Sequence, residues 1–128
     1  MSPIIPSTRL GDLGVIGNCQ FSALADNRGE IVWCCFPRFD SEPVCSTLLD
    51  AEGGGFFRIS PANGEAGTQR YLPNTNILET VFQTSTGSFR IIDFAPRFLQ
   101  FDRAFRPTQL MRIVEPIEGT PRISVVCE

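Results

Sequence analysis

The sequence predicts an all-β protein, folded as an antiparallel β-sandwich with one short helix. Runs of β-branched and aromatic residues recur along the chain, and turn residues separate them at intervals of about eight to twelve positions, as in known sandwiches. The chain includes 11 Gly and 10 Pro, which suits many turns better than a helical bundle. Its 128 residues, 42% of them hydrophobic, fit a single globular domain over residues 1–128.

The first half of the chain is expected to contain a β-hairpin. Residues 1–12 should form an irregular lead-in. Residues 14–25 are predicted to be one strand with a kink at Gly17, and residues 30–36 (EIVWCCF) a second strand. The segment Asp26–Gly29 between them favours a tight turn with positive φ at its glycine.

The one predicted helix lies after Ser41 and before the glycine run at residues 53–55. Asp40 or Ser41 would cap it, with Glu42 and Pro43 in its first turn, where both residue types are favoured. Its apolar face would comprise Val44, Leu48 and Leu49.

The second half of the chain is predicted to contain only strands and loops. Thr86-Gly87 joins two of these strands and favours a hairpin. The segment from Pro96 to Pro107, rich in Arg and Phe, is expected to be a connection. The predicted strands are residues 56–60, 70–72, 76–85, 88–94, 108–115 and 122–127.

Charge and hydropathy exclude two classes of partner. The net charge is −3, and the 11 positive side chains are all arginines scattered along the chain, so a nucleic-acid partner is not expected. No apolar run approaches the roughly 20 residues of a membrane-spanning helix, so no membrane partner is expected. Residues 1–20 lack the layout of a signal peptide, which favours a cytoplasmic location.

The five cysteines are expected to be free thiols. Their odd number and irregular spacing argue against a disulfide framework. Adjacent Cys34 and Cys35 would point to opposite faces of a strand, and the chain has no His, so no metal site is predicted. No cofactor is expected either.

An ordered series of motifs resembles the N-terminal region of glycoside hydrolase family 15 proteins, in their trehalase-like and glucoamylase-like branch. The order and spacing agree over roughly residues 10–118. The motifs are Ile16–Cys19 (IGNC), Ala23-Leu24, Gly29–Trp33 (GEIVW), Cys35–Ser41 (CFPRFDS), Leu48–Asp50, Phe57–Ile59, Tyr71–Asn76 (YLPNTN), Leu78–Thr80 and Ile92–Pro96 (IDFAP).

The resemblance implies a non-catalytic domain. In that family a β-sandwich precedes a helical barrel, and two glutamates of the barrel hydrolyse α-glucosidic bonds with inversion, one as acid and one as base. Neither glutamate can be assigned to a residue of this chain. The implied partners are the barrel of the parent chain and an α-glucoside at the interface between them. Alternatives are a stand-alone carbohydrate-binding module and an oligomerisation module.

The same resemblance covers only about the first half of the family's sandwich. The chain is therefore expected to be either a fragment of a longer hydrolase or a short protein that completes its sheet with another copy. In both cases an open sheet edge would be adhesive. We therefore expect a homo-oligomer formed through a sheet edge.

The loop Arg38-Phe39-Asp40-Ser41 contains the best candidate functional residues. Arg38 and Asp40 can hydrogen-bond sugar hydroxyls, and the ring of Phe39 can stack on a pyranose. By resemblance the loop would lie at the rim of the substrate pocket or between domains. The structural alternative is that Arg38 and Asp40 brace the loop while Ser41 caps the helix.

Trp33, the only Trp, is a further candidate as a stacking platform, although its apolar strand favours core packing. Asp93 lies between two apolar residues and is expected to pair with an arginine. A further arrangement to consider places Glu79 and Asp93 face to face across the hairpin of residues 76–94, but a flat sheet would give two carboxylates no pocket.

Overall fold

The computed structural model describes residues 13–128, which form twelve strands and contain no helix. Every strand pairing is antiparallel. The all-β prediction is thus confirmed. The strands are β1 (Gly14–Gly17), β2 (Ser22–Ala25), β3 (Glu30–Cys35), β4 (Pro43–Cys45), β5 (Phe57–Pro61), β6 (Thr68–Tyr71), β7 (Leu78–Thr84), β8 (Gly87–Phe94), β9 (Phe98–Gln100), β10 (Arg103–Phe105), β11 (Met111–Gly119) and β12 (Ile123–Cys127).

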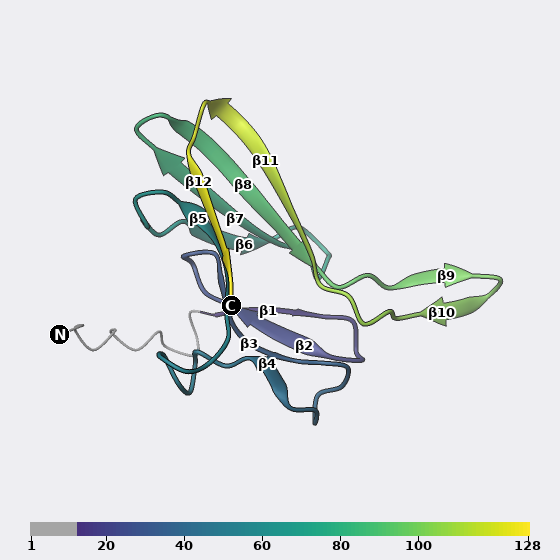
Figure 1. Ribbon diagram of the computed structural model, residues 1–128. Helices are drawn as coiled ribbons and strands as arrows, with labels where there is room; N and C mark the ends of the chain where they lie inside the picture. The colour runs from purple at the N-terminus through teal and green to yellow at the C-terminus, as the bar shows by residue number, and fades with distance from the viewer. Residues whose placement is uncertain (1–12) are drawn as a thin grey trace.

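Two larger sheets form a sandwich-like arrangement, and a third, two-stranded sheet projects from it. The six-stranded sheet has the order β1-β2-β3-β5-β12, with β4 beside β3, and the four-stranded sheet has the order β11-β8-β7-β6. Figure 1 shows the β9–β10 hairpin extending well away from the rest of the molecule. We call the segment of residues 95–110, which contains this hairpin, the arm.

The core lies in two neighbouring clusters where the larger sheets meet. One cluster is built around Ile16, Phe21 and Leu78, and the other around Phe82 and Phe89. The rings of Phe82 and Phe89, which are partners in the β7–β8 register, stack with their centroids 5.0 Å apart. The first cluster brings Ile16 of the six-stranded sheet against Leu78 of the four-stranded sheet, so the burial of these side chains holds the two layers together.

The predicted short helix is wrong. Pro43–Cys45 instead form β4, with Cys45 opposite Cys34 of β3. After it the chain makes isolated turns, in which the amides of Leu49 and Asp50 both donate to the carbonyl of Ser46. So short a segment forms too few backbone hydrogen bonds to offset the free-energy cost of nucleating a helix. The open edge of β3 instead offers strand pairing to Pro43–Cys45, whose central residue, Val44, is β-branched.

Two strand predictions are also wrong in detail. Residues 14–25 form two strands, β1 and β2, because the backbone reverses at Asn18-Cys19, where Cys19 has φ of 72°. The segment from Pro96 to Pro107 contains the β9–β10 hairpin. The β2–β3 and β7–β8 hairpins are confirmed, and Gly29 has the predicted positive φ, 81°. The lead-in at residues 1–12 lies outside the described residues.

A buried ion pair joins the two larger sheets. The side chains of Asp93 on β8 and Arg112 on β11 are 1% and 2% exposed, and Arg112 Nε donates to Asp93 Oδ1 at 2.7 Å. The same guanidinium donates to the carbonyls of Phe57 at 3.1 Å and Gly29 at 2.8 Å, both in the other sheet or its turns. The expected pairing of Asp93 with an arginine is confirmed. Burial raises the pKa of Asp93, and the positive charge of Arg112 opposes that rise.

We expect Asp93→Asn to destabilise the fold by about 3–5 kcal/mol, because it leaves the charge of Arg112 buried without a counter-charge. Urea unfolding measures this as a lower midpoint with an unchanged slope. Asp40→Asn is the matched control, since its partner is exposed, and should cost at most about 1 kcal/mol. Equal effects of the two variants would contradict the role assigned to the buried pair.

Candidate functional site

The predicted Arg38–Ser41 loop joins β3 to β4 and is braced by its own residues. Arg38 Nε lies 3.4 Å from Asp40 Oδ1, with the two side chains 67% and 76% exposed. The amide of Arg38 donates to Ser41 Oγ at 3.1 Å, and the amide of Ser41 donates back to the carbonyl of Arg38 at 3.1 Å. These contacts match the structural alternative, except that Ser41 closes a turn and caps no helix. A pocket-rim role for this loop stays a prediction.

Phe39 is the exposed aromatic residue of this loop, with 58% of its surface accessible. Together with Arg38 and Asp40 it lines a shallow depression of about 400 Å³, whose other wall is the β1–β2 turn at Cys19 and Gln20. The depression combines one aromatic ring with an open cation and carboxylate. It therefore suits a polar ligand or a neighbouring surface better than an enclosed apolar ligand.

Trp33 is half-buried in β3, opposite Leu24 of β2. It does not stand out from the sheet as a free platform. Its position also separates it from the Arg38–Ser41 depression, which it does not line. A role for Trp33 at a substrate rim stays a prediction.

The arm is anchored by Asn18, a residue that sequence reasoning did not single out as functional. Asn18 is 2% exposed, and its Nδ2 donates to the carbonyls of Pro96 at 3.0 Å and Pro107 at 2.9 Å. Its Oδ1 accepts from the amide of Gln20 at 3.0 Å. One buried amide thus ties both ends of the arm to the β1–β2 turn, next to the depression at Phe39. In the sequence, only the motif Ile16–Cys19, which includes Asn18, drew attention to this residue.

The arm presents an unusual amount of apolar surface. Phe98 and Phe105 stack across the hairpin with centroids 5.5 Å apart, yet remain 48% and 40% exposed. Leu99 and Phe101 are 77% and 89% exposed. The arm also carries three arginines and one aspartate, so it is both apolar and cationic. Exposed apolar patches rimmed by polar groups are typical of protein interfaces.

The tip of the arm is also strained. Phe101 and Asp102 form a two-residue turn with φ of 52° and 60°, which is the twist that a tight hairpin requires. A left-handed conformation costs roughly 1–2 kcal/mol for a residue with a side chain, and Phe gains no local hydrogen bond in return. The tip of the arm therefore presents the ring of Phe101, which is 89% exposed, at a cost in backbone strain.

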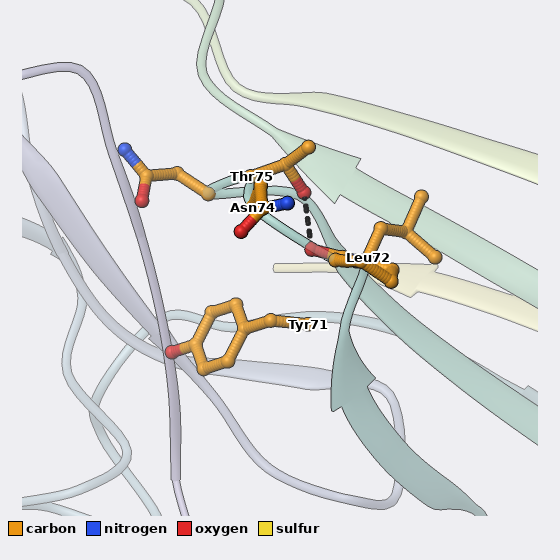
Figure 2. Close-up of a pocket in the computed structure, with 6 residues that line it drawn as sticks. Tyr71, Leu72, Asn74 and Thr75 are labelled. Carbon is orange, nitrogen blue, oxygen red and sulfur yellow. Dashed lines mark hydrogen bonds between the residues drawn. The ribbon is translucent and has the colours of Figure 1, made fainter.

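The loop between β6 and β7 makes a second hollow, of about 490 Å³ (Figure 2). Thr75 fixes it, since its hydroxyl donates to the carbonyl of Leu72 at 2.8 Å and accepts from the amide of Ile77 at 3.2 Å. Figure 2 shows the hydroxyl of Tyr71 directed away from Thr75. That hydroxyl instead bonds the backbone of Val15 in β1. The hollow offers amides and hydroxyls but no charged group.

The two buried carboxylates of the β7–β8 hairpin do not face each other. Leu78 is opposite Asp93 and Glu79 is opposite Ile92, so the two acids lie on opposite faces of the sheet. Glu79 accepts from Arg70 at 2.6 Å and from Arg90 at 2.8 Å. The hydrogen bond from Arg70, joined by that from Arg90, holds the pKa of Glu79 below its usual value. Neither acid is placed for paired acid–base chemistry.

The trehalase-like, N-terminal family model matches residues 6–125. The chain belongs to this family. It is 32% identical over 137 residues to the trehalase of Mycolicibacterium smegmatis, covering 96% of this chain and 20% of that protein. It is 44% identical over 84 residues to trehalase 1 of Sulfolobus acidocaldarius, covering 66% of this chain and 15% of that protein. Comparison with solved structures gave no match.

The resemblance in the sequence motifs is thereby confirmed at the level of a trehalase-like N-terminal domain. The chain spans about a fifth of the length of the curated relatives that it matches over most of its own length. Among residues 13–128, no helix is long and apolar enough to cross a membrane. The same part of the chain places no group of three or more Cys, Asp or Glu side chains where they could hold a metal ion.

Removing the anchor of the arm should release it. In Asn18→Leu the carbonyls of Pro96 and Pro107 lose their buried hydrogen-bond donor. Each carbonyl that water does not reach should lower the stability of this region by about 1–3 kcal/mol. We expect faster amide hydrogen exchange over residues 98–105 and unchanged exchange over β7 and β8. Asn76→Leu, in the exposed β6–β7 loop, is the matched control and should leave the exchange of the arm unchanged. Unaltered exchange of the arm in Asn18→Leu would contradict the anchoring role.

The pairing of Glu79 predicts a dependence of stability on pH. The pKa of Glu79 is lower in the folded than in the unfolded state. Its contribution to the free energy of unfolding is therefore fully present above the usual pKa of 4.5, and it is lost as the pH falls through the folded-state pKa. The difference in unfolding free energy between the wild type and Glu79→Gln should therefore shrink as the pH falls below 4.5. Glu65→Gln, in an exposed loop, should have little effect at any pH. A constant difference for Glu79→Gln would refute this account.

Proposed function

We propose that this domain is the non-catalytic accessory domain of a hydrolase that cleaves α-glucosidic bonds, as in trehalose or α-glucans. The observation that carries the proposal is the anchored apolar arm, in a domain whose family relatives are named trehalases. The catalytic acid and base would lie in a helical barrel elsewhere in the parent protein, which is expected to invert the anomeric carbon.

The two buried acids of the four-stranded sheet, Glu79 and Asp93, are not arranged as an acid–base pair. A glycosidase that inverts needs two carboxyl groups about 6.5–9.5 Å apart on either side of a bound sugar. The two buried acids of the four-stranded sheet are each bound by arginines, and they lie on opposite faces. The hollow in the β6–β7 loop is lined by no acid at all. These observations support an accessory role.

The arm and the Arg38–Ser41 loop together supply a surface that suits a protein partner. Phe101 at the tip and Phe39 near the base are both largely exposed. Asn18, between them, gives the arm a defined direction at its root. We propose that this surface contacts the barrel of the parent enzyme and helps to shape the rim of its pocket. An arm held at both ends loses less conformational entropy on docking than a free loop, which favours this use.

The proposal is tested in the M. smegmatis trehalase by replacing the segment that matches this chain. The purified domain alone should release no glucose from trehalose. The chimera should hydrolyse trehalose, whereas the trehalase lacking the segment should not. Glucose release by the domain alone, or full activity of the truncated trehalase, would contradict the accessory role.

The arm is tested in the same chimera. Replacing both Phe98 and Phe105 with Ser should lower activity at least about tenfold, if the pair is a buried anchor of the interface. The control is Ile113→Ser on the exposed face of β11, which should leave activity within about twofold. If the double variant keeps the activity of the parent chimera, the arm does not make the contact proposed for it.

A further inference from the structure

The hollow in the β6–β7 loop has an uncharged lining of mixed polar and apolar character. Its walls are the residues Tyr71–Asn76 (YLPNTN), and its volume of about 490 Å³ falls within the roughly 300–1,000 Å³ of known ligand pockets. Neither the arm nor the Arg38–Ser41 loop includes these residues. The proposed function therefore leaves this motif without a role.

The shape of the hollow is fixed by bonds within its own loop. The hydroxyl of Thr75 donates to the carbonyl of Leu72 at 2.8 Å, and the amide of Leu72 donates to the carbonyl of Ile77 at 2.9 Å. Asn74 has φ of 59°, in the left-handed region that asparagine tolerates better than most residues. A loop closed in this way loses little conformational entropy when a ligand binds to it.

Tyr71 contributes the face of its ring to the hollow. Its hydroxyl is already used, because it accepts from the amide of Val15 at 2.7 Å and donates to the carbonyl of the same residue at 3.2 Å. The side chain is nevertheless 47% exposed. The face of an aromatic ring carries partial negative charge, which attracts the partially positive C–H groups of a sugar ring. Tyr71 is thus a fixed platform on which a pyranose can stack.

Asn74 and Asn76 supply the free hydrogen-bonding groups of the hollow. Both are exposed, and neither side chain makes a hydrogen bond to another residue among residues 13–128. In Figure 2 the side chain of Asn74 points from the loop toward the side on which the ring of Tyr71 lies. A primary amide presents donors and an acceptor next to each other, which matches two neighbouring sugar hydroxyls.

From these features we propose that the hollow of residues 71–76 binds one neutral hexopyranose unit of an α-glucoside. The sugar ring lies on the face of Tyr71, and the amides of Asn74 and Asn76 hydrogen-bond its hydroxyls. The uncharged lining disfavours a phosphorylated sugar, which arginine or lysine would recognise. The pyranose class follows from the hollow itself, whereas the choice of α-glucosides rests on the proposed function. Such a site would raise the concentration of substrate beside the barrel.

The depression at Phe39 is the competing position for a sugar. Its charged groups, Arg38 and Asp40, lie 3.4 Å apart, so a sugar would have to displace their mutual contact. The amides of Asn74 and Asn76 have no such partner within residues 13–128, so they bind hydroxyls without losing a bond. Because the hollow covers only one side of a sugar, we expect a dissociation constant of about a few millimolar.

Titration of the isotope-labelled 128-residue chain, followed by NMR of its backbone amides, tests the site. Trehalose and maltotriose should each shift the resonances of residues 71–77 and leave those of residues 38–41 in place. Sorbitol is the control, because it has hydroxyls but no ring, and it should shift neither set.

Three results of this titration would overturn the proposal. They are the absence of shifts up to about 50 mM sugar, roughly tenfold above the expected dissociation constant, equal shifts with sorbitol, and shifts confined to residues 38–41. None of them bears on the accessory role, which is measured by glucose release from the chimera.

Asn74→Gly tests the amide without disturbing the loop, because glycine adopts positive φ freely. The dissociation constant for maltotriose should rise at least about fivefold, since hydrogen bonds to the sugar are lost. Asn63→Gly, in the exposed turn between β5 and β6, is the matched control and should leave the affinity unchanged. An unchanged affinity of Asn74→Gly overturns the role given to the amide.

Two variants of Tyr71 test the ring separately from its hydroxyl. Tyr71→Phe and Tyr71→Leu both lose the hydrogen bonds to Val15, but only the phenylalanine keeps an aromatic face. Tyr71→Phe should bind maltotriose within about threefold of the wild type, and Tyr71→Leu at least about tenfold more weakly. Urea unfolding of both variants monitors the loss of the shared hydrogen bonds. Equal affinities of the two variants overturn the stacking on Tyr71.

Discussion

The buried pair of Asp93 and Arg112 is the interaction on which the rest of this domain depends. Arg112 lies on β11, its carboxylate partner on β8, and its remaining donors reach the carbonyls of Gly29 and Phe57 in the other sheet. Its guanidinium also lies 4.9 Å from the centroid of the Phe57 ring. A charge so enclosed is tolerated only when its geometry and hydrogen bonds are complete. The pair therefore sets the relative position of the two layers.

The same principle, a buried polar group with all its partners satisfied, positions the functional surface. Asn18 uses its amide to hold both ends of the arm and its oxygen to hold the β1–β2 turn. The apolar residues of the arm are consequently presented on a supported projection. On the outer face of the four-stranded sheet, Glu79 plays a comparable part by joining Arg70 of β6 to Arg90 of β8. The buried carboxylates of Asp93 and Glu79 thus stabilise the fold by binding arginines.

Local patterns in the sequence accounted for most of the fold and for part of the candidate site. The turns at Asp26–Gly29 and Thr86-Gly87 were predictable because glycine position and flanking alternation define hairpins locally. The Arg38–Ser41 loop was recognised from its motif, and its internal bracing agreed with one of the two interpretations. The helix after Ser41 was mispredicted because its capping signals are visible in the sequence, while the competing edge of β3 becomes available only once the sheet has formed.

By itself, the sequence determined the all-β class, the principal hairpins and the membership of a trehalase-like family, since each depends on short-range periodicity or ordered motifs. Only the tertiary structure decided that Asn18 anchors the arm and that Arg112 bridges the two sheets. The contacts of Asn18 span 78 and 89 residues, and those of Arg112 span up to 83. Contacts of that range depend on strand register and layer packing, and a shift of one residue turns a side chain to the other face of its sheet.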